Sequence, residues 1–221
     1  MSNKFSAFQH TPEDSHQAWE QSMLRQIETL RADLRRLAQQ QTPERLAHLC
    51  GGQAFGGQIE LRYWYQAVRV DWQTLEWSDQ LSGAALPVYD QALLLYYLHT
   101  ANGTSLADRW VSFRELPGGG FYHQAFQGYS GDLVAKAFSS TPENYLAACQ
   151  KAGGNALTSL GEYTFAFEPL PKIHLAAVLW PGDEDFPTRA GILFDAASIN
   201  YLPIDGLALI GSKLARRILR A

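Results

Sequence analysis

Three successive glycines, Gly118 to Gly120, stand just before a tyrosine and a histidine, Tyr122 and His123. Glycine adopts positive φ angles at little cost, so a glycine run lets a ligand approach its backbone N–H groups closely. A phenol and an imidazole beside such a run can orient a ligand or transfer a proton. Two interpretations therefore stay open for this stretch: a ligand-gripping loop, and a simple turn beside a surface histidine.

A second stretch with chemical potential holds three adjacent carboxylates, Asp183, Glu184 and Asp185, between Trp180 and Phe186. Clustered carboxylates bind a hard cation through oxygen ligands or share a proton between them. The spacing of a calcium-binding loop is absent, and the preceding Pro-Gly pair is typical of a tight turn. The alternative is a solvated hairpin tip between two core aromatics, Trp180 and Phe186, with the acids exposed.

The common catalytic and metal-binding signatures are absent from the sequence. No two histidines stand three or four residues apart, and there is no HExxH, GxSxG or P-loop pattern. The two cysteines, Cys50 and Cys149, form no CxxC pair, so we expect buried thiols without a disulfide, a zinc site or an iron–sulfur cluster. The sequence identifies no metal and no cofactor.

Composition points to a globular protein without a strong electrostatic preference. The 221 residues are 46% hydrophobic and 12% aromatic, with a formal net charge of −4. That balance argues against disorder, and it lacks the basic excess of most nucleic-acid binders. The N-terminus has no apolar core of signal-peptide length, and no apolar run approaches the length of a membrane span, so we expect a soluble cytoplasmic protein.

The first predicted element of the chain is a long N-terminal helix, from about residue 12 to residue 40. Thr11 and Pro12 are typical of a helix start. An apolar stripe then follows one helical face: Met23, Ile27, Leu30, Leu34 and Leu37. The stripe packs on the body of the protein, or it forms a coiled-coil contact with a second copy or another protein. Both alternatives stay open.

The rest of the chain reads as α+β, with a largely antiparallel sheet and packed helices. We divide it into an N-terminal helical segment, 1–50, and an α+β domain, 51–221. Alternating apolar residues predict a hairpin over 59–72 that turns at Gln66-Ala67, after a glycine-rich linker over 51–57. The doubly apolar run Ile173–Trp180 predicts a central strand, and Ile204–Arg220 predicts a closing helix.

Two motifs carry a resemblance to a known family. FRELPGGGFY, then LWPGDEDFPTRAGILFD followed by Tyr201-Leu202-Pro203, resemble an uncharacterised bacterial and archaeal family, domain of unknown function 3786. The resemblance extends from about Ile59 to the C-terminus. Some relatives carry a cysteine-rich iron–sulfur segment at the N-terminus, where this chain has a cysteine-free helix. The resemblance implies no catalytic residues.

Two functional hypotheses follow. The first is a non-catalytic accessory or ligand-binding protein, which rests on the missing catalytic signatures and on the long helix as a docking element. The second is a small enzyme of unnamed reaction class that uses Tyr122, His123 and a carboxylate from 183–185. The second hypothesis requires that the two loops form one concave pocket.

Overall fold

A computed structural model of the chain describes residues 24–25, 27–37 and 39–221. Residues 24–25 and 27–37 are helical, and Ile27, Leu30 and Leu34 are buried within this single chain. The described part of the apolar stripe thus packs on the body. The remainder of the predicted helix, including Thr11 and Met23, lies outside the described residues, and contact of the helix with a partner stays a prediction.

The described strands form two antiparallel sheets. The first has the order β1-β2-β3-β4 and the second has the order β5-β9-β8-β7-β6. The strands of the first sheet are β1 (Gln53–Phe55), β2 (Gln58–Tyr63), β3 (Gln66–Asp71) and β4 (Trp77–Asp79). Those of the second are β5 (Trp110–Ser112), β6 (Asn155–Ala156), β7 (Thr164–Leu170), β8 (Ile173–Trp180) and β9 (Arg189–Asp195). The predicted α+β class with antiparallel strands is confirmed.

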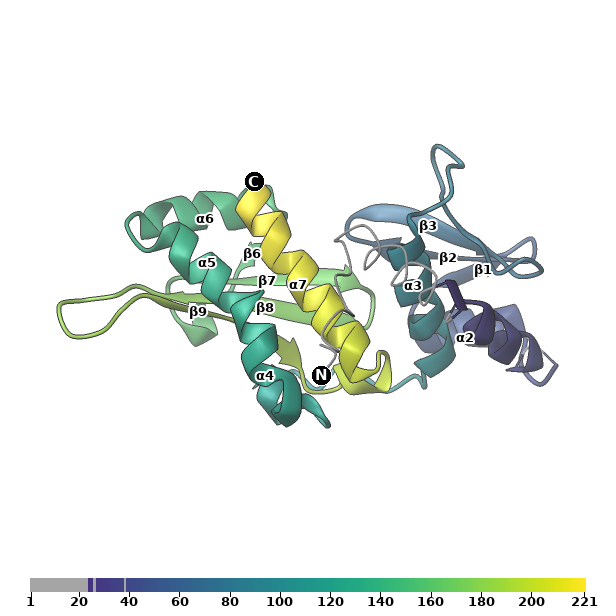
Figure 1. Cartoon of the computed structure of the whole chain (residues 1–221). Helices are drawn as coiled ribbons and strands as arrows, with labels where there is room; N and C mark the ends of the chain where they lie inside the picture. Colours follow the sequence, from purple (N-terminus) through teal and green to yellow (C-terminus); the bar gives the residue numbers. More distant parts are fainter. Residues whose placement is uncertain (1–23, 26, 38) are drawn as a thin grey trace, which may run out of the picture.

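Helices accompany both sheets, and one continuous apolar core joins the two halves. Figure 1 shows α2 (Pro43–Cys50) and α3 (Val88–Thr100) beside the first sheet. The helices over the second sheet are α4 (Gly119–Gly128), α5 (Gly131–Phe138), α6 (Pro142–Lys151) and α7 (Ile204–Arg220). Three short 3-10 turns complete the described elements: η1 (Phe113–Glu115), η2 (Thr158–Leu160) and η3 (Ser198–Asn200). Among the described helices, none combines the length and apolarity needed to cross a membrane.

Local sequence signals account for several of these boundaries. The hydroxyl of Thr42 accepts the backbone N–H of Arg45 at 3.3 Å, Pro43 opens α2, and Gly51 ends it at φ 75°. The closing helix α7 has the bounds that the sequence predicted, Ile204–Arg220. Its apolar stripe is buried, which fixes the direction in which its cationic residues point.

The prediction that Ile173–Trp180 is a central strand is confirmed, because β8 lies between β7 and β9. The accompanying prediction that Trp180 and Phe186 are core aromatics is wrong, since their side chains are 44% and 65% exposed. Trp180 is the last residue of β8, and it pairs with Arg189 at the base of the hairpin that leaves the core. Periodicity identified the strand but not the point at which the strand passes the edge of the core.

The turn of the first hairpin is also different from its prediction. β2 and β3 are joined by Trp64 and Tyr65, not by Gln66-Ala67, and both residues have positive φ, 48° and 73°. Such turns usually contain Asn or Gly, because a side chain in the left-handed region costs about 1–2 kcal/mol. Tertiary contacts offset that cost. The Trp64 side chain is 6% exposed, and the backbone N–H of Trp64 donates to the carbonyl of Pro169 at 3.0 Å. The predicted linker over 51–57 likewise contains a strand, β1.

Candidate functional site

The glycine run predicted as a loop forms the start of helix α4. Gly118 caps the helix at φ 80°, Gly119 is buried as its first residue, and Gly120 follows on the exposed side. Tyr122 is 58% exposed, and Nδ1 of His123 lies 2.8 Å from the carbonyl of Gly120, one turn earlier. The histidine ring therefore contacts its own helix.

The acidic residues form the tip of the β8–β9 hairpin, and all are exposed. The carboxylate of Asp183 accepts the backbone N–H groups of Asp185 at 2.9 Å and Phe186 at 2.8 Å, and Asp183 N–H donates to Phe186 O. Asp183 thus has a local role in closing the turn. Over the part of the chain that the structure describes, no group of three or more His, Cys, Asp and Glu side chains is arranged to hold a metal ion.

The two predicted loops lie apart. Figure 1 shows the β8–β9 hairpin projecting from one end of the second sheet, well away from the start of α4. Neither of the two cavities described below is lined by Gly118, Gly119, Gly120, Tyr122, His123, Asp183, Glu184 or Asp185. Ligand binding by these residues stays a prediction.

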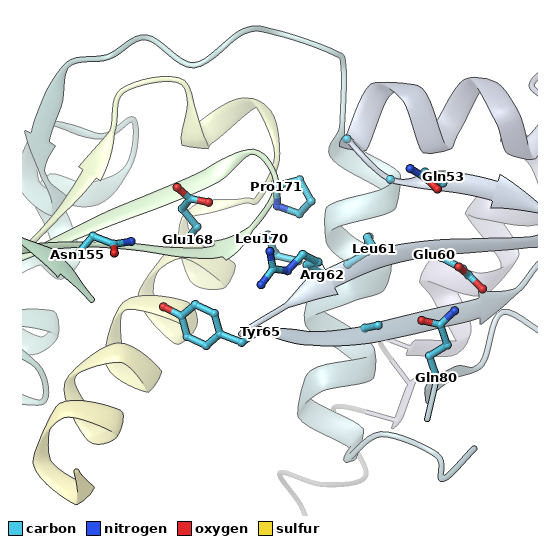
Figure 2. A pocket seen from close by; sticks show the side chains of 13 residues that line it. Gln53, Glu60, Leu61, Arg62, Tyr65, Gln80, Asn155, Glu168, Leu170 and Pro171 are labelled. Atoms are coloured by element: carbon cyan, nitrogen blue, oxygen red, sulfur yellow. The ribbon is translucent and has the colours of Figure 1, made fainter. Parts of the chain in front are cut away.

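The larger cavity is a cleft of about 640 Å³ between the two sheets (Figure 2). The first sheet and its flanking turns contribute most of the polar lining. These polar side chains are Gln53, Glu60, Arg62, Tyr65 and Gln80, and the methyl group of Ala67 also lines the cleft. Strand alternation explains the set on β2: Ile59, Leu61 and Tyr63 are buried, so Glu60 and Arg62 point to the opposite face.

The second sheet closes the cleft from the other side. Its lining side chains are Asn155 on β6, Glu168 and Leu170 on β7, and Pro171 beyond β7. The β7–β8 pairing shifts register between Phe167 and Leu170, so Glu168 lies at a bulge without a regular cross-strand partner. Bulges commonly redirect a side chain beside a functional site.

Figure 2 shows the side chain of Arg62 between Glu168 on one side and Glu60 on the other. Among the described residues, no ion pair within 4.0 Å joins Arg62 to either carboxylate. The cleft therefore presents both signs of charge, with no direct ion pair between Arg62 and these two carboxylates. Such a surface favours a ligand that supplies the missing partners.

Tyr65 forms the wall of the cleft where the sheets meet. Its hydroxyl donates to the carbonyl of Gly153 at 2.5 Å, and the guanidinium of Arg217 lies 5.9 Å from its ring centroid and 4.9 Å from that of Trp64. Burial raises the pKa of the Tyr65 phenol, while the nearby charges of Arg217, Glu168 and Arg62 act on it in opposing directions. The phenol is therefore protonated at neutral pH, and its single proton is used in the hydrogen bond to Gly153.

Behind the cleft, a polar cluster joins β2, α3 and α7. The hydroxyl of Tyr63 donates to Oδ1 of Asp90 at 2.6 Å, and Nζ of Lys213 donates to the same oxygen and lies 3.1 Å from the Tyr63 hydroxyl. Burial, and next the Asp90 carboxylate, raise the pKa of Tyr63. Tyr63 is 4% exposed and faces away from the cleft, so this cluster has a structural role in holding α7 to the first sheet.

A smaller hollow of about 290 Å³ lies at the base of the β8–β9 hairpin. Trp180, Arg189 and Asp132 line it, and the side chain amide of Gln127 donates to Asp132 at 2.7 Å and to the Ala190 carbonyl at 2.9 Å. The amide of Gln127 and one oxygen of Asp132 are thus already used in internal hydrogen bonds.

The sequence alone did not identify the residues of the cleft. The alternation of Glu60 and Arg62 with apolar neighbours showed that both point away from the core. Nothing local indicated that Glu168 would face them across more than one hundred residues of chain. One local signal for the wall of the cleft was the Gly153-Gly154 pair. Gly153 permits the close approach of Tyr65, which lines the cleft.

No curated protein and no solved structure matches this chain. The family described as a domain of unknown function (DUF3786) matches residues 42–217. The match includes α2, both sheets and nearly all of α7. The cleft lies wholly within it. The chain therefore belongs to the family of domain of unknown function 3786.

Proposed function

We propose that this protein is a non-catalytic ligand-binding module whose ligand occupies the cleft between the two sheets. The observation that carries the proposal is the unpaired Arg62 at the centre of a mixed-charge cleft of about 640 Å³. The cleft has the size and the convergent polar groups that are typical of small-molecule sites. It also lies where two sheets meet, so a ligand contacts both halves of the core.

The enzyme alternative has less support. It required the Tyr122–His123 stretch and the acidic tip to form one pocket, and neither stretch lines the cavities described above. The exposed position of Tyr122 and the internal contact of His123 give these side chains no shared reaction centre. A docking role of the N-terminal helix as an accessory element stays a prediction.

The test is equilibrium dialysis of the purified protein against a metabolite extract, followed by mass spectrometry of the enriched compounds. Ala67 is exposed on β3 and lines the cleft, so Ala67→Trp fills the cleft without emptying the core. Gln58→Trp is the matched control, because Gln58 lies on the same face of the first sheet and does not line the cleft.

We expect wild type and Gln58→Trp to enrich the same compound and Ala67→Trp to lose it, with all three proteins folded by circular dichroism. Enrichment of no compound by wild type would overturn the proposal. Equal enrichment by Ala67→Trp would overturn it as well, since the ligand would then lie elsewhere.

A further inference from the structure

We propose that the cleft binds a zwitterionic ligand of the amino acid class, a free amino acid or a short peptide, with its carboxylate on Arg62 and its ammonium group on Glu168. This inference rests on the proposed function of the cleft and names the ligand chemistry. It is carried by the arrangement of unpaired charges across the two sheets.

Arg62 has no partner of its own on the first sheet. In the β2–β3 register Arg62 stands opposite Ala67, whereas Glu60 stands opposite Arg69. Side chains directly opposite on one face are close enough to interact, so Glu60 has a cation within reach and Arg62 has no anion opposite it. The planar guanidinium of arginine matches a carboxylate in a bidentate geometry.

Glu168 is the complementary unpaired group on the second sheet. It is exposed, it lines the cleft, and among the described residues no ion pair within 4.0 Å involves it. Its position at the β7 bulge leaves it without a cross-strand neighbour of opposite charge. A primary ammonium group supplies up to three donors to such a carboxylate.

Other ligand classes fit these charges less well. A phosphate or a dicarboxylate would satisfy Arg62 and would then meet the negative charges of Glu60 and Glu168. A polyamine would satisfy the carboxylates and meet Arg62. A neutral sugar would reduce the hydration of both charges without replacing it, which costs free energy. A ligand that carries both charges pairs its carboxylate with Arg62 and its ammonium group with Glu168.

The remaining lining groups suit the rest of such a molecule. The amides of Gln53, Gln80 and Asn155 offer both donors and acceptors to peptide groups or to a polar side chain. The ring of Tyr65, 41% exposed, offers an apolar surface beside the charged groups. Arg62 and Glu168 therefore lie toward the middle of the cleft, and the amides lie beyond them on both sides (Figure 2).

The test measures the melting temperature of the full chain with each of the twenty L-amino acids and with glycylglycine. At one hundred times the Kd, a ligand specific for the folded state raises Tm by roughly 5–10 °C. Each compound that raises Tm is then titrated by calorimetry together with its C-terminal amide and its N-acetyl derivative. We expect both derivatives to bind roughly tenfold to hundredfold more weakly, as loss of a charge-assisted contact predicts.

Variants assign each contact. Arg62→Met should lower the affinity for the parent compound by the same factor and leave the affinity for the amide unchanged. Glu168→Gln should weaken the parent compound and leave the affinity for the N-acetyl form unchanged. Arg69→Met is the matched control for charge removal on the same face, because Arg69 does not line the cleft, and it should bind as wild type does.

The inference is overturned if no compound of the panel raises Tm, if the amide binds as tightly as the acid, or if Arg62→Met binds normally. These outcomes are separable from failure of the proposed function. A metabolite that is enriched by wild type, lost in Ala67→Trp and not zwitterionic would leave the binding function standing and remove the amino acid class.

Discussion

The ring of Tyr65 lies directly against Gly153. The phenol donates to the Gly153 carbonyl at 2.5 Å, and a Cβ added to Gly153 would lie 2.5 Å from ring carbon Cε2. The contact joins the β2–β3 turn to the connection between α6 and β6, so it ties the two sheets together at the wall of the cleft. Gly153 also has φ 90°, which an L side chain rarely adopts.

Gly153→Ala should therefore lower the free energy of unfolding for two reasons. The left-handed backbone costs about 1–2 kcal/mol with a side chain. Displacement of the Tyr65 ring adds about 1–3 kcal/mol of overpacking. We expect a total loss of about 2–5 kcal/mol by urea titration, the sum of these two estimates.

Gly83→Ala is the control for the backbone effect alone. Gly83 has φ 71°, and a Cβ there would meet no atom within 4 Å. Gly83→Ala should lower the free energy of unfolding by only about 1–2 kcal/mol. Equal losses in the two variants would mean that the Tyr65 contact does not restrict position 153.

The glycine run at the start of α4 should show three different responses to alanine. A Cβ on Gly119 would lie 1.8 Å from the carbonyl oxygen of Phe113, so Gly119→Ala should cost several kcal/mol, more than about 3. Gly118→Ala should cost about 1–2 kcal/mol because of its φ of 80°. Gly120→Ala meets no atom within 4 Å and should gain about 0.4–1 kcal/mol in the helix.

Thermal unfolding of these three variants checks the order. A loss on Gly120→Ala comparable to that of Gly119→Ala would contradict the geometry of α4. If Gly120→Ala keeps its stability and loses a ligand that wild type binds, the sequence hypothesis of a ligand-gripping stretch gains support. In that case Tyr122 and His123 would be the next positions to substitute.

Elements whose signals are local were predictable from the sequence. The Thr-Pro-Glu cap of α2, the apolar stripe of α7 and the doubly apolar run of β8 all depend on residues within one element. The β2–β3 turn was not predictable, because Trp64 and Tyr65 are poor turn residues in isolation. They are held in that conformation by Pro169, Gly153 and Arg217, which lie far away in the sequence.

The candidate site likewise has features that the local sequence predicts and features that depend on distant residues. The outward direction of Arg62 follows from strand alternation, a local property. The position of Glu168 opposite Arg62 follows from how two sheets pack, and no local pattern encodes it. Sequence reasoning therefore selected residues with conspicuous chemistry, such as Tyr122 and Asp183, over residues that share a cavity.

Leu30→Asp should destabilise the protein strongly, because Leu30 is 5% exposed and the substitution brings a charge into the core. We expect a loss of about 3 kcal/mol or more in urea unfolding. Leu24→Asp is the matched control on the same helix, where the side chain is already 46% exposed, and it should change stability by less than about 0.5 kcal/mol. Similar effects of both substitutions would show that the described part of the helix does not pack on the body in solution.

Stability should fall as the pH rises from 9 to 11. Burial raises the pKa of the Cys50 thiol to about 11 and that of Cys149 to about 12, both from an ordinary value of 9.0. Within this window the unfolded chain releases these protons and the folded chain keeps them, so ionisation favours unfolding. Each thiol contributes a slope of up to about 1.4 kcal/mol per pH unit.

Urea titrations at pH 8 and pH 10 should show this loss. Removal of both thiols in Cys50→Ala/Cys149→Ala should reduce the slope, and buried tyrosines such as Tyr63 should maintain part of it at higher pH because burial also raises their pKa. An unchanged slope in the double variant would assign the alkaline loss to the tyrosines alone.

The cluster of Tyr63, Asp90 and Lys213 should behave as one coupled unit. Asp90 and Lys213 keep 14% and 25% of their side chains exposed, so their pairing is weakened only in part by solvent. Lys213→Met leaves the Asp90 carboxylate with the Tyr63 hydroxyl as its remaining hydrogen-bond partner in the cluster and should cost about 2–4 kcal/mol. Asp90→Leu leaves the ammonium group of Lys213 without its anionic partner and should cost a similar amount.

The double variant Asp90→Leu/Lys213→Met should be more stable than the sum of the single losses predicts, because no unpaired charge remains between β2, α3 and α7. A coupling free energy of about 1–3 kcal/mol in this double-mutant cycle is the expected result. Additive losses would show that the two side chains do not interact in solution.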